Sequence, residues 1–250
     1  MASEGPSDEA ANKAANENGE SQPLCEYEII PDGDIILVAG PEKKRVRLSS
    51  HLLYTTSQVF KAMIHSGFKE GETFRQSDGA FIEIELPSDN AATFFNAFRA
   101  LYCPDPTRQL SPKEVQQVAI LADKYDMAGH FVYAASFWLV QQGTANKWTI
   151  EQLWQLFTAS YWLKCPLGFI HFSKKLVFKK SVPLVKYVSG MPDKALGFKL
   201  CLAIESIRHA RLQKDITTEV GVCLSCFDGA TEGFVKPGPN CETPHYHIPS

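Results

Sequence analysis

The sequence predicts an α+β fold in which a small sheet is flanked by a cluster of helices and followed by further helices. Three observations lead to this prediction. Two short apolar runs joined by a tight turn stand near residue 40, an alternating run occupies residues 81–86, and helical periodicity fills most of the chain after residue 91. Strands that precede a long series of helices are typical of folds in which the helices are segregated from the sheet.

The stretch Pro31–Phe68 is predicted to form two strands followed by two short helices. The run Ile35–Val38 is apolar, rich in β-branched residues and flanked by glycines, which is typical of a buried strand. Gly40–Glu42 forms the turn, and Val46–Leu48 alternates apolar and basic residues, as a strand with one wet face does. Ser57 is the expected N-cap of the second helix.

Each downstream element has its own signal. The run Ile82–Leu86 alternates apolar residues with glutamates and predicts a half-exposed strand, and Ser88 is the expected cap of the helix that follows. Capping-box patterns begin at Ser111 and Thr149. Helices are expected over residues 91–102, 112–125, 128–140, 150–161, 167–180 and 192–212.

Several sequence blocks follow one another in a characteristic order. They are DGDIILV from residue 32, VRL from residue 46, LYTTSQVFKAM from residue 53, GFKEG from residue 67 and LADKYDM from residue 121. In this order they resemble the BTB/POZ domain, in particular its divergent form common in fungal proteins. The resemblance covers about half of the chain and implies a BTB/POZ fold over residues 27–140 with a role in protein–protein interaction.

The remaining chain divides by composition. Residues 1–24 are expected to form a disordered acidic tail, because they carry five acidic residues and one lysine and contain little to bury. Many BTB domains place an extra helix and strand here that build a homodimer interface, and no amphipathic helix precedes Tyr27, so these dimer elements are expected to be missing. Residues 148–222 are expected to form a helical extension, and residues 223–250 a C-terminal tail containing Cys and His.

Composition narrows the classes of function. A net charge of −3 argues against a dedicated nucleic-acid binder. No apolar run approaches the length of about 18 residues that a membrane helix needs, and the N-terminus lacks a secretory signal, so a cytoplasmic or nuclear location is expected. In such a reducing compartment the seven scattered cysteines are expected to be thiols or metal ligands.

The C-terminal tail contains a group of candidate metal ligands. Cys223 and Cys226 form a Cys-x-x-Cys pair, and Cys241 and His245 follow it. Thiolates and an imidazole with this spacing can complete a tetrahedral zinc shell, and the polar segment between them would gain order from a metal. Two interpretations stay open at this point, a structural zinc site and a loose tail with unrelated cysteines.

Motifs of enzymes are absent from the sequence. There is no Gly-x-Ser-x-Gly elbow, phosphate-binding loop or His-Glu-x-x-His pattern. His51 and His65, like the pair Asp123 and Asp126, are expected to be structural or solvated rather than catalytic. We therefore predict that the protein is not an enzyme.

A lysine-rich run over residues 164–186 has two interpretations. Six lysines alternate there with Phe169, Phe172 and Phe178, and no acidic residue lies between Glu151 and Asp193. Basic and aromatic residues together can bind single-stranded nucleic acid or a membrane surface. The commoner interpretation is a solvated helix face whose aromatic residues belong to the core.

The BTB resemblance also implies a partner contact. BTB domains that recruit cullin ubiquitin-ligase scaffolds carry a hydrophobic-x-Glu motif after their second helix, and Phe68-Lys69-Glu70 matches it. Two positions depart from the family. Ser49 replaces a usual His, and Ser50 replaces the basic residue that pairs with Asp34 in the transcription-factor members. Since no zinc-finger array follows, a DNA-binding repressor is not expected.

Two hypotheses of function follow. The first is a non-enzymatic protein–protein interaction module, either an adaptor for a cullin-type ubiquitin ligase or a self-associating scaffold. In it, Phe68 and Glu70 make one contact. The alternative is a zinc-stabilised, nucleic-acid-associated transcriptional regulator that uses the lysine run and the metal ligands Cys223, Cys226, Cys241 and His245.

Overall fold

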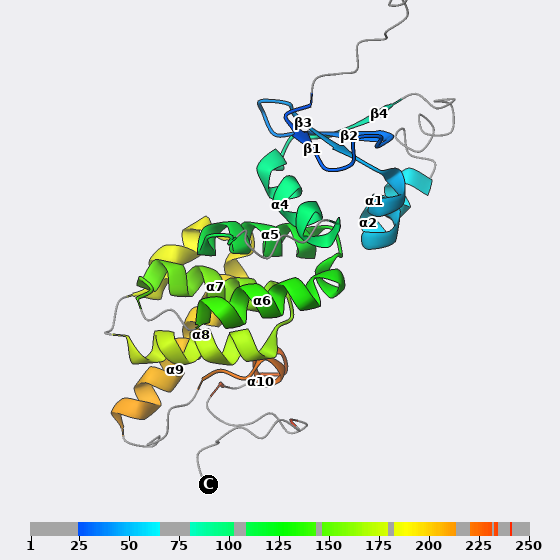
Figure 1. Cartoon of the computed structure of the whole chain (residues 1–250). Helices are drawn as coiled ribbons and strands as arrows, with labels where there is room; N and C mark the ends of the chain where they lie inside the picture. The colour runs from blue at the N-terminus through cyan, green and yellow to red at the C-terminus, as the bar shows by residue number, and fades with distance from the viewer. Residues whose placement is uncertain are drawn as a thin grey trace, which may run out of the picture.

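The computed structural model describes residues 25–65, 81–102, 109–143, 147–179, 183–213, 221–231, 233, 234 and 241, with the backbone alone for residues 140–143. The sheet lies at one end of the molecule, and the helices stack away from it toward the C-terminal segment (Figure 1). The predicted α+β class is therefore confirmed. The acidic tail expected at residues 1–24 lies outside the described residues.

A four-stranded sheet has the order β1-β3-β2-β4. The strands β2 (Ile35–Ala39) and β3 (Lys44–Leu48) form the predicted antiparallel hairpin, and β4 (Ile82–Leu86) lies parallel to β2. At the opposite edge, β1 (Tyr27–Glu28) pairs in parallel with β3. The sequence does not predict this edge strand, because two residues are too few to show a period.

Burial along the strands follows their composition. β2 is buried at every position, whereas β4 alternates buried and exposed residues with Ile82, Ile84 and Leu86 inward, as predicted. The turn between β2 and β3 depends on Gly40, whose φ of +76° lies in the left-handed region that favours glycine. The Gly40 amide also donates to the carbonyl of Leu86 over 3.1 Å, which ties the turn to β4.

The two predicted short helices are α1 (Ser50–Thr56) and α2 (Gln58–His65). Ser57 lies between them and acts as the predicted N-cap, since its hydroxyl accepts a hydrogen bond from the backbone N–H of Phe60 over 3.1 Å. The same hydroxyl donates to the carbonyl of Tyr125 over 2.6 Å. One buried side chain therefore joins the start of α2 to the end of a helix far along the chain.

The next two helices along the chain pack against each other, and the first of them lies against the sheet. The first of them, α4 (Ala91–Tyr102), begins two residues later than it would if Ser88 were its N-cap. The backbone N–H of Thr93 donates to the side chain of Asn90 over 3.0 Å, so the prediction that Ser88 caps this helix is wrong. A turn closed by the amide of Asp89 and the carbonyl of Leu86 separates β4 from the helix. The next helix, α5 (Pro112–Lys124), begins with the predicted capping box.

The helix expected over residues 128–140 consists of two parts. A 3₁₀ turn, η1 (Ala128–Phe131), leads into α6 (Val132–Gly143), which continues three residues beyond the predicted end. The extension then contains α7 (Ile150–Trp162) with its predicted capping box, α8 (Pro166–Phe178), the 3₁₀ segment η2 (Leu184–Gly190), α9 (Lys194–Leu212) and α10 (Leu224–Asp228).

One hydrophobic core runs through the molecule. Buried residues from Ile35 in the sheet to Phe227 in α10 form a single connected cluster. α5 and α7 pack against each other within it, and the side-chain amide of Gln116 donates to the hydroxyl of Thr158 across this interface over 2.7 Å. The segments expected at residues 27–140 and 148–222 therefore share their interior.

Candidate functional site

Three cysteine thiols meet near α10, at the end of the molecule away from the sheet (Figure 1). The sulfur atoms of Cys223, Cys226 and Cys241 all lie within 4.8 Å of one another, and those of Cys223 and Cys241 are 3.8 Å apart. Cys223 and Cys226 are buried, and Cys241 is half-buried. The spacing of the cysteines in the sequence correctly indicated this convergence.

The local fold of α10 explains how the first two thiols face the same point. Cys223 is the N-cap residue of α10 and has an extended backbone, while Cys226 lies in the first turn of the helix. The backbone N–H of Phe227 donates to the carbonyl of Cys223 over 2.9 Å, which closes that turn. A short helical turn after an extended residue thus places both sulfurs on one side.

The segment before Cys223 is attached to α8 by close packing. A side chain at Gly221 would collide with the backbone carbonyl of Ile170, so only glycine allows the approach. The backbone N–H of Val222 then donates to the hydroxyl of Ser173 over 2.8 Å. Both partners are buried, so this bond satisfies a backbone donor away from water.

Phe227 anchors the other side of α10 in the core. Its side chain is 1% exposed, and its ring lies 5.5 Å from that of Phe169 and 5.6 Å from that of Tyr161. The ammonium group of Lys199 lies 4.6 Å from the ring of Phe227. The loose-tail interpretation is therefore wrong for residues 223–231, because packing contacts that have no local sequence signal hold this segment on the helices.

The donor set can bind a metal ion. A tetrahedral centre with metal–sulfur bonds of about 2.3 Å places its sulfurs about 3.8 Å apart, which is the separation of Cys223 and Cys241. Soft thiolates select zinc, copper(I) and iron–sulfur centres over calcium or magnesium. His245, the fourth ligand expected from the sequence, lies outside the described residues.

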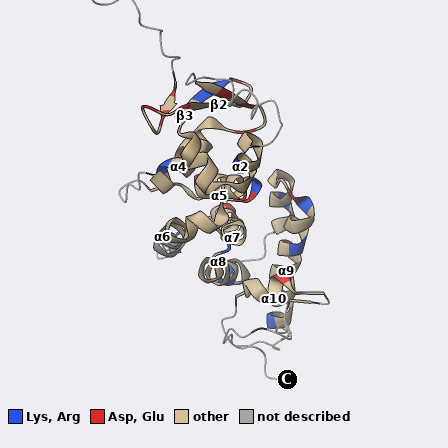
Figure 2. Ribbon diagram, turned by 90° about the vertical axis from the view of Figure 1, so that its right-hand side faces the viewer, with Lys and Arg blue, Asp and Glu red and all other residues tan. Residues whose placement is uncertain are grey.

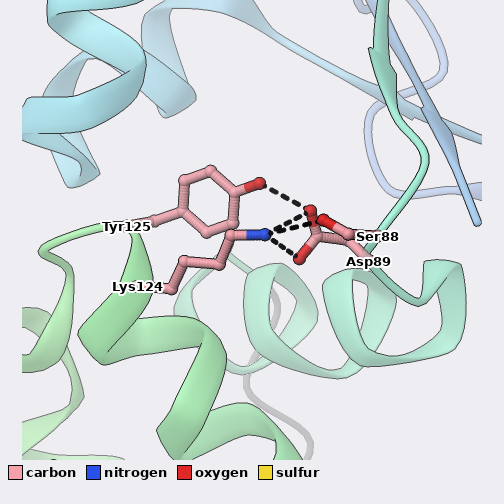
Figure 3. Close-up of polar contacts among 4 residues, drawn as sticks. All are labelled: Ser88, Asp89, Lys124 and Tyr125. Atoms are coloured by element: carbon pink, nitrogen blue, oxygen red, sulfur yellow. Dashed lines mark hydrogen bonds and ion pairs between the residues drawn. The ribbon is translucent and has the colours of Figure 1, made fainter. Parts of the chain in front are cut away.

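A second polar cluster joins the loop after β4 to the end of α5 (Figure 3). The carboxylate of Asp89 accepts hydrogen bonds from the ammonium group of Lys124 over 2.7 and 2.8 Å and from the hydroxyl of Tyr125 over 2.8 Å. Lys124 also donates to the hydroxyl of Ser88 over 3.3 Å. The sequence did not indicate this cluster, because its members lie about 35 positions apart and carry no shared motif.

This cluster has the features of a structural contact. The side chain of Asp89 is 7% exposed, and its charge is paired with Lys124. Burial, together with the hydrogen bond to Asp89, raises the pKa of the Tyr125 hydroxyl well above its ordinary value. A hydroxyl that keeps its proton so firmly is a poor general base, and the cluster instead holds the end of α5 to the loop after β4.

The histidines and aspartates singled out in the sequence are either exposed to solvent or occupied in hydrogen bonds. His51, His65, Asp123 and Asp126 are all exposed. Asp34 accepts hydrogen bonds of 2.6 Å each from the backbone N–H and the hydroxyl of Ser50. The carboxylate that precedes β2 is thus satisfied by Ser50.

Two of the three aromatic residues of the lysine-rich run belong to the core. Phe169 and Phe172 are 0% exposed, so neither can stack on a nucleic-acid base. Phe178 is partly exposed, but the guanidinium group of Arg211 lies 3.7 Å from its ring centre. The interpretation of a solvated basic face over a buried aromatic layer is the one that fits these positions.

Phe68 and Glu70, which the sequence suggests for a contact with a cullin, lie outside the described residues. In the part of the chain that is described, no helix is long and apolar enough to cross a membrane.

No family model matches the chain, and no curated protein matches it either.

Proposed function

We propose that residues 27–140 form a BTB/POZ domain and that the protein is a non-enzymatic protein-binding module, with the helices after residue 148 as a docking extension. The order of elements supports this proposal. An antiparallel hairpin is followed by two short helices, by β4 next to β2, and by helices that continue away from the sheet. The resemblance in sequence follows the same order.

The observation that carries the binding function is an exposed apolar face on α9. Phe198, Leu202 and Leu212 are 50%, 60% and 83% exposed, although the opposite side of the helix is buried. Ala195, Phe198, Leu202, Glu205, His209 and Leu212 follow the alternating three- and four-residue spacing of a helix-pairing seam. We call these six residues the α9 stripe. Four of the six are apolar, and an exposed helix face of this kind is suited to a partner helix.

The charges beside the α9 stripe indicate the chemistry of that partner. Lys and Arg residues occur along the length of α9, where Figure 2 colours the ribbon blue. Glu205 is the one acidic residue between positions 194 and 213, and it is paired with Arg208 over 2.6 Å. A second copy of α9 would bring like charges together, whereas a partner helix with acidic flanks would be attracted. We therefore propose an amphipathic helix with acidic flanks as the partner.

Binding of defined peptides tests this proposal. An amphipathic helical peptide with glutamate flanks should bind the full chain, and the same peptide with lysine flanks should bind at least tenfold more weakly. Leu202→Glu should abolish the binding measured by fluorescence anisotropy. Tyr133→Glu is the matched control, because Tyr133 is 90% exposed on α6. Equal binding by both variants would contradict the assignment of the surface.

The cullin contact is a narrower part of the proposal. Phe68 and Glu70 are assigned to it by resemblance. A purified cullin scaffold should bind the wild-type chain and bind the double variant Phe68→Ala, Glu70→Ala far more weakly, with circular dichroism unchanged. No binding by the wild-type chain would remove the adaptor role, and light scattering would then test the self-associating scaffold.

Zinc is the metal that we propose for the thiol cluster, with Cys223, Cys226 and Cys241 as ligands. The cluster favours the zinc half of the alternative hypothesis, whereas the burial of Phe169 and Phe172 removes the stacking surface from its nucleic-acid half. Bound zinc would cross-link α10 to Cys241 and stabilise the folded chain. Free zinc at about 1,000 times its dissociation constant adds about 4 kcal/mol.

Metal content and cobalt spectra test the zinc site. The purified protein should contain one zinc per chain, and cobalt in its place should give the intense sulfur-to-metal absorption of a thiolate site. The double variant Cys223→Ser, Cys226→Ser should lose both signals. Cys201→Ser is the control, because Cys201 is a buried cysteine of α9 outside the cluster. The site would be refuted if the purified protein contained no zinc and a chelator did not change its melting temperature.

A further inference from the structure

We infer that Cys223 and Cys241 form a peroxide-sensitive thiol pair, whose oxidation to a disulfide expels the metal from the cluster. This inference rests on the proposed zinc site and adds a covalent modification to it. The two sulfur atoms are 3.8 Å apart, and a disulfide requires about 2.05 Å. Closing the bond therefore needs a displacement of less than 2 Å, roughly the length of one bond.

The fold favours this pair over Cys223 with Cys226. Cys223 and Cys226 belong to the same helical turn, whose hydrogen bond between Phe227 and Cys223 holds their backbones in place. Cys241 reaches the cluster from a separate segment, 18 positions after Cys223. It can therefore approach Cys223 without unwinding α10 or disturbing the packing of Phe227.

Access to solvent sets the order of events. Cys241 is half-buried, whereas Cys223 is 7% exposed. Peroxide therefore meets the Cys241 thiolate first. That sulfur attacks one peroxide oxygen, the O–O bond breaks, and a sulfenic acid forms together with hydroxide, which takes up a proton to become water.

The second step closes the disulfide and removes the ligands. The Cys223 thiolate attacks the sulfur of the sulfenic acid, the S–S bond forms, and the S–O bond breaks with release of hydroxide, which is protonated to water. Two thiolates, one hydrogen peroxide and two protons thus give one disulfide and two waters. Two electrons pass from sulfur to peroxide, and the zinc ion leaves with its charge unchanged because a single thiolate ligand is left.

Burial protects two of the cysteines outside the cluster from the same oxidation. Cys201 is buried in α9, and burial raises the pKa of its thiol to about 11, so it stays protonated and unreactive at neutral pH. Cys165 is also buried and stands apart from the cluster as the N-cap residue of α8. The new disulfide closes the same segment of chain that the metal closed, so the C-terminal part stays attached after zinc has left.

The test treats the zinc-loaded full chain with hydrogen peroxide. Zinc release is followed with a chromogenic chelator, disulfide formation by the loss of two hydrogens in the intact mass, and the pairing by peptide mapping. We expect one zinc released per disulfide, a linked peptide containing Cys223 and Cys241, and full reversal by a phosphine reductant with added zinc. The Cys201→Ser variant should respond as the wild type does.

Three results would overturn the inference. Zinc could stay bound at peroxide concentrations that oxidise a zinc-finger peptide, zinc could leave while the mapped disulfide joins Cys226 to either of the other two cysteines, or the oxidised product could hold no disulfide. In each of these the zinc site itself survives. Protein that contains no zinc before treatment refutes the proposed site and the inference together.

Discussion

Single buried hydroxyls connect parts of this chain that lie far apart in sequence. Ser57 both accepts from the amide of Phe60 and donates to the carbonyl of Tyr125, 68 positions away. Its role as an N-cap was predictable, because capping depends on a residue type and its place before a helix. Its second bond was not, since nothing local in the sequence marks the end of α5 as a neighbour.

Ser57→Ala should therefore cost more than a typical surface cap. The change leaves one buried donor and one buried acceptor without a partner, which is expected to lower the free energy of unfolding by about 1–3 kcal/mol. Urea unfolding followed by circular dichroism measures the loss. Ser136→Ala is the control, because the hydroxyl of Ser136 is exposed and bonds within its own helix, so its removal should change stability by about 0.5 kcal/mol or less. Equal costs in the two variants would contradict the bridging role.

The Tyr125 hydroxyl makes stability depend on alkaline pH. Burial, with the hydrogen bond to Asp89, raises its pKa in the folded protein above the ordinary value of about 10. The folded state thus holds this proton more tightly than the unfolded state. The stabilisation is complete below about pH 10 and is lost as the pH rises further.

Tyr125→Phe should remove this pH dependence along with one hydrogen bond. At neutral pH we expect a loss of about 1.5–3 kcal/mol, because the hydroxyl donates to a charged carboxylate. The difference in unfolding free energy between wild type and variant should then shrink above about pH 10. Urea titrations across this range measure it, and the contributions of the other tyrosines cancel in the difference. A difference that stays constant would refute the assignment.

At the scale of elements, features that depend on neighbouring residues were predicted correctly, and features that depend on distant contacts were missed. Three of the predictions depend on a few adjacent residues each, and all three are confirmed. They are the capping boxes at Ser111 and Thr149 and the alternation of buried and exposed residues in β4. The bounds of α4 were predicted correctly, but its cap was misassigned, because a turn closed by Asp89 and Leu86 leaves Asn90 and not Ser88 at the cap position. β1 was missed because its strand character comes from β3 and not from its own sequence.

The attachment of α10 is the clearest case of an element held by distant contacts. Gly221 touches the carbonyl of Ile170 in α8, and Val222 bonds to Ser173 in the same helix. The pattern of cysteines indicated a metal site, but the packing that brings it onto α8 depends on a glycine that no sequence rule marks. The candidate ligands can therefore be identified from the sequence, whereas the packing that holds them in place is visible only in the fold.

Gly221→Ala should loosen this attachment. The added methyl group has no room beside Ile170, so α10 must withdraw, at an expected cost of about 1–3 kcal/mol in unfolding free energy. Zinc affinity should fall with it, because Cys223 follows two residues later. Gly229→Ala is the matched control, since the nearest atom to its added methyl group lies 3.5 Å away. Thermal unfolding and zinc titration of both variants measure the effect, and a neutral Gly221→Ala would show that α10 does not depend on this contact.

At the scale of the whole molecule, the continuous core argues against two independent domains. Composition and resemblance divide the chain into residues 27–140 and 148–222, because sequence patterns report on each helix separately. Which helices share an interior depends on the faces that they present to each other, and α5 packs against α7 across that division. The sheet and the helical extension should therefore unfold together.

Leu37→Ala tests this cooperativity from the end of the molecule where the sheet lies. Leu37 is fully buried in β2, and its truncation should cost about 2–5 kcal/mol. All four tryptophans lie between residues 138 and 162, so their fluorescence reports on the helices alone. In a single cooperative unit the fluorescence midpoint in urea falls as far as the midpoint measured by circular dichroism. The control Glu85→Ala, at an exposed position of β4, should leave both midpoints in place. An unchanged fluorescence midpoint in Leu37→Ala would mean that the helical extension folds without the sheet, and that a partner bound to α9 is held by a separate domain.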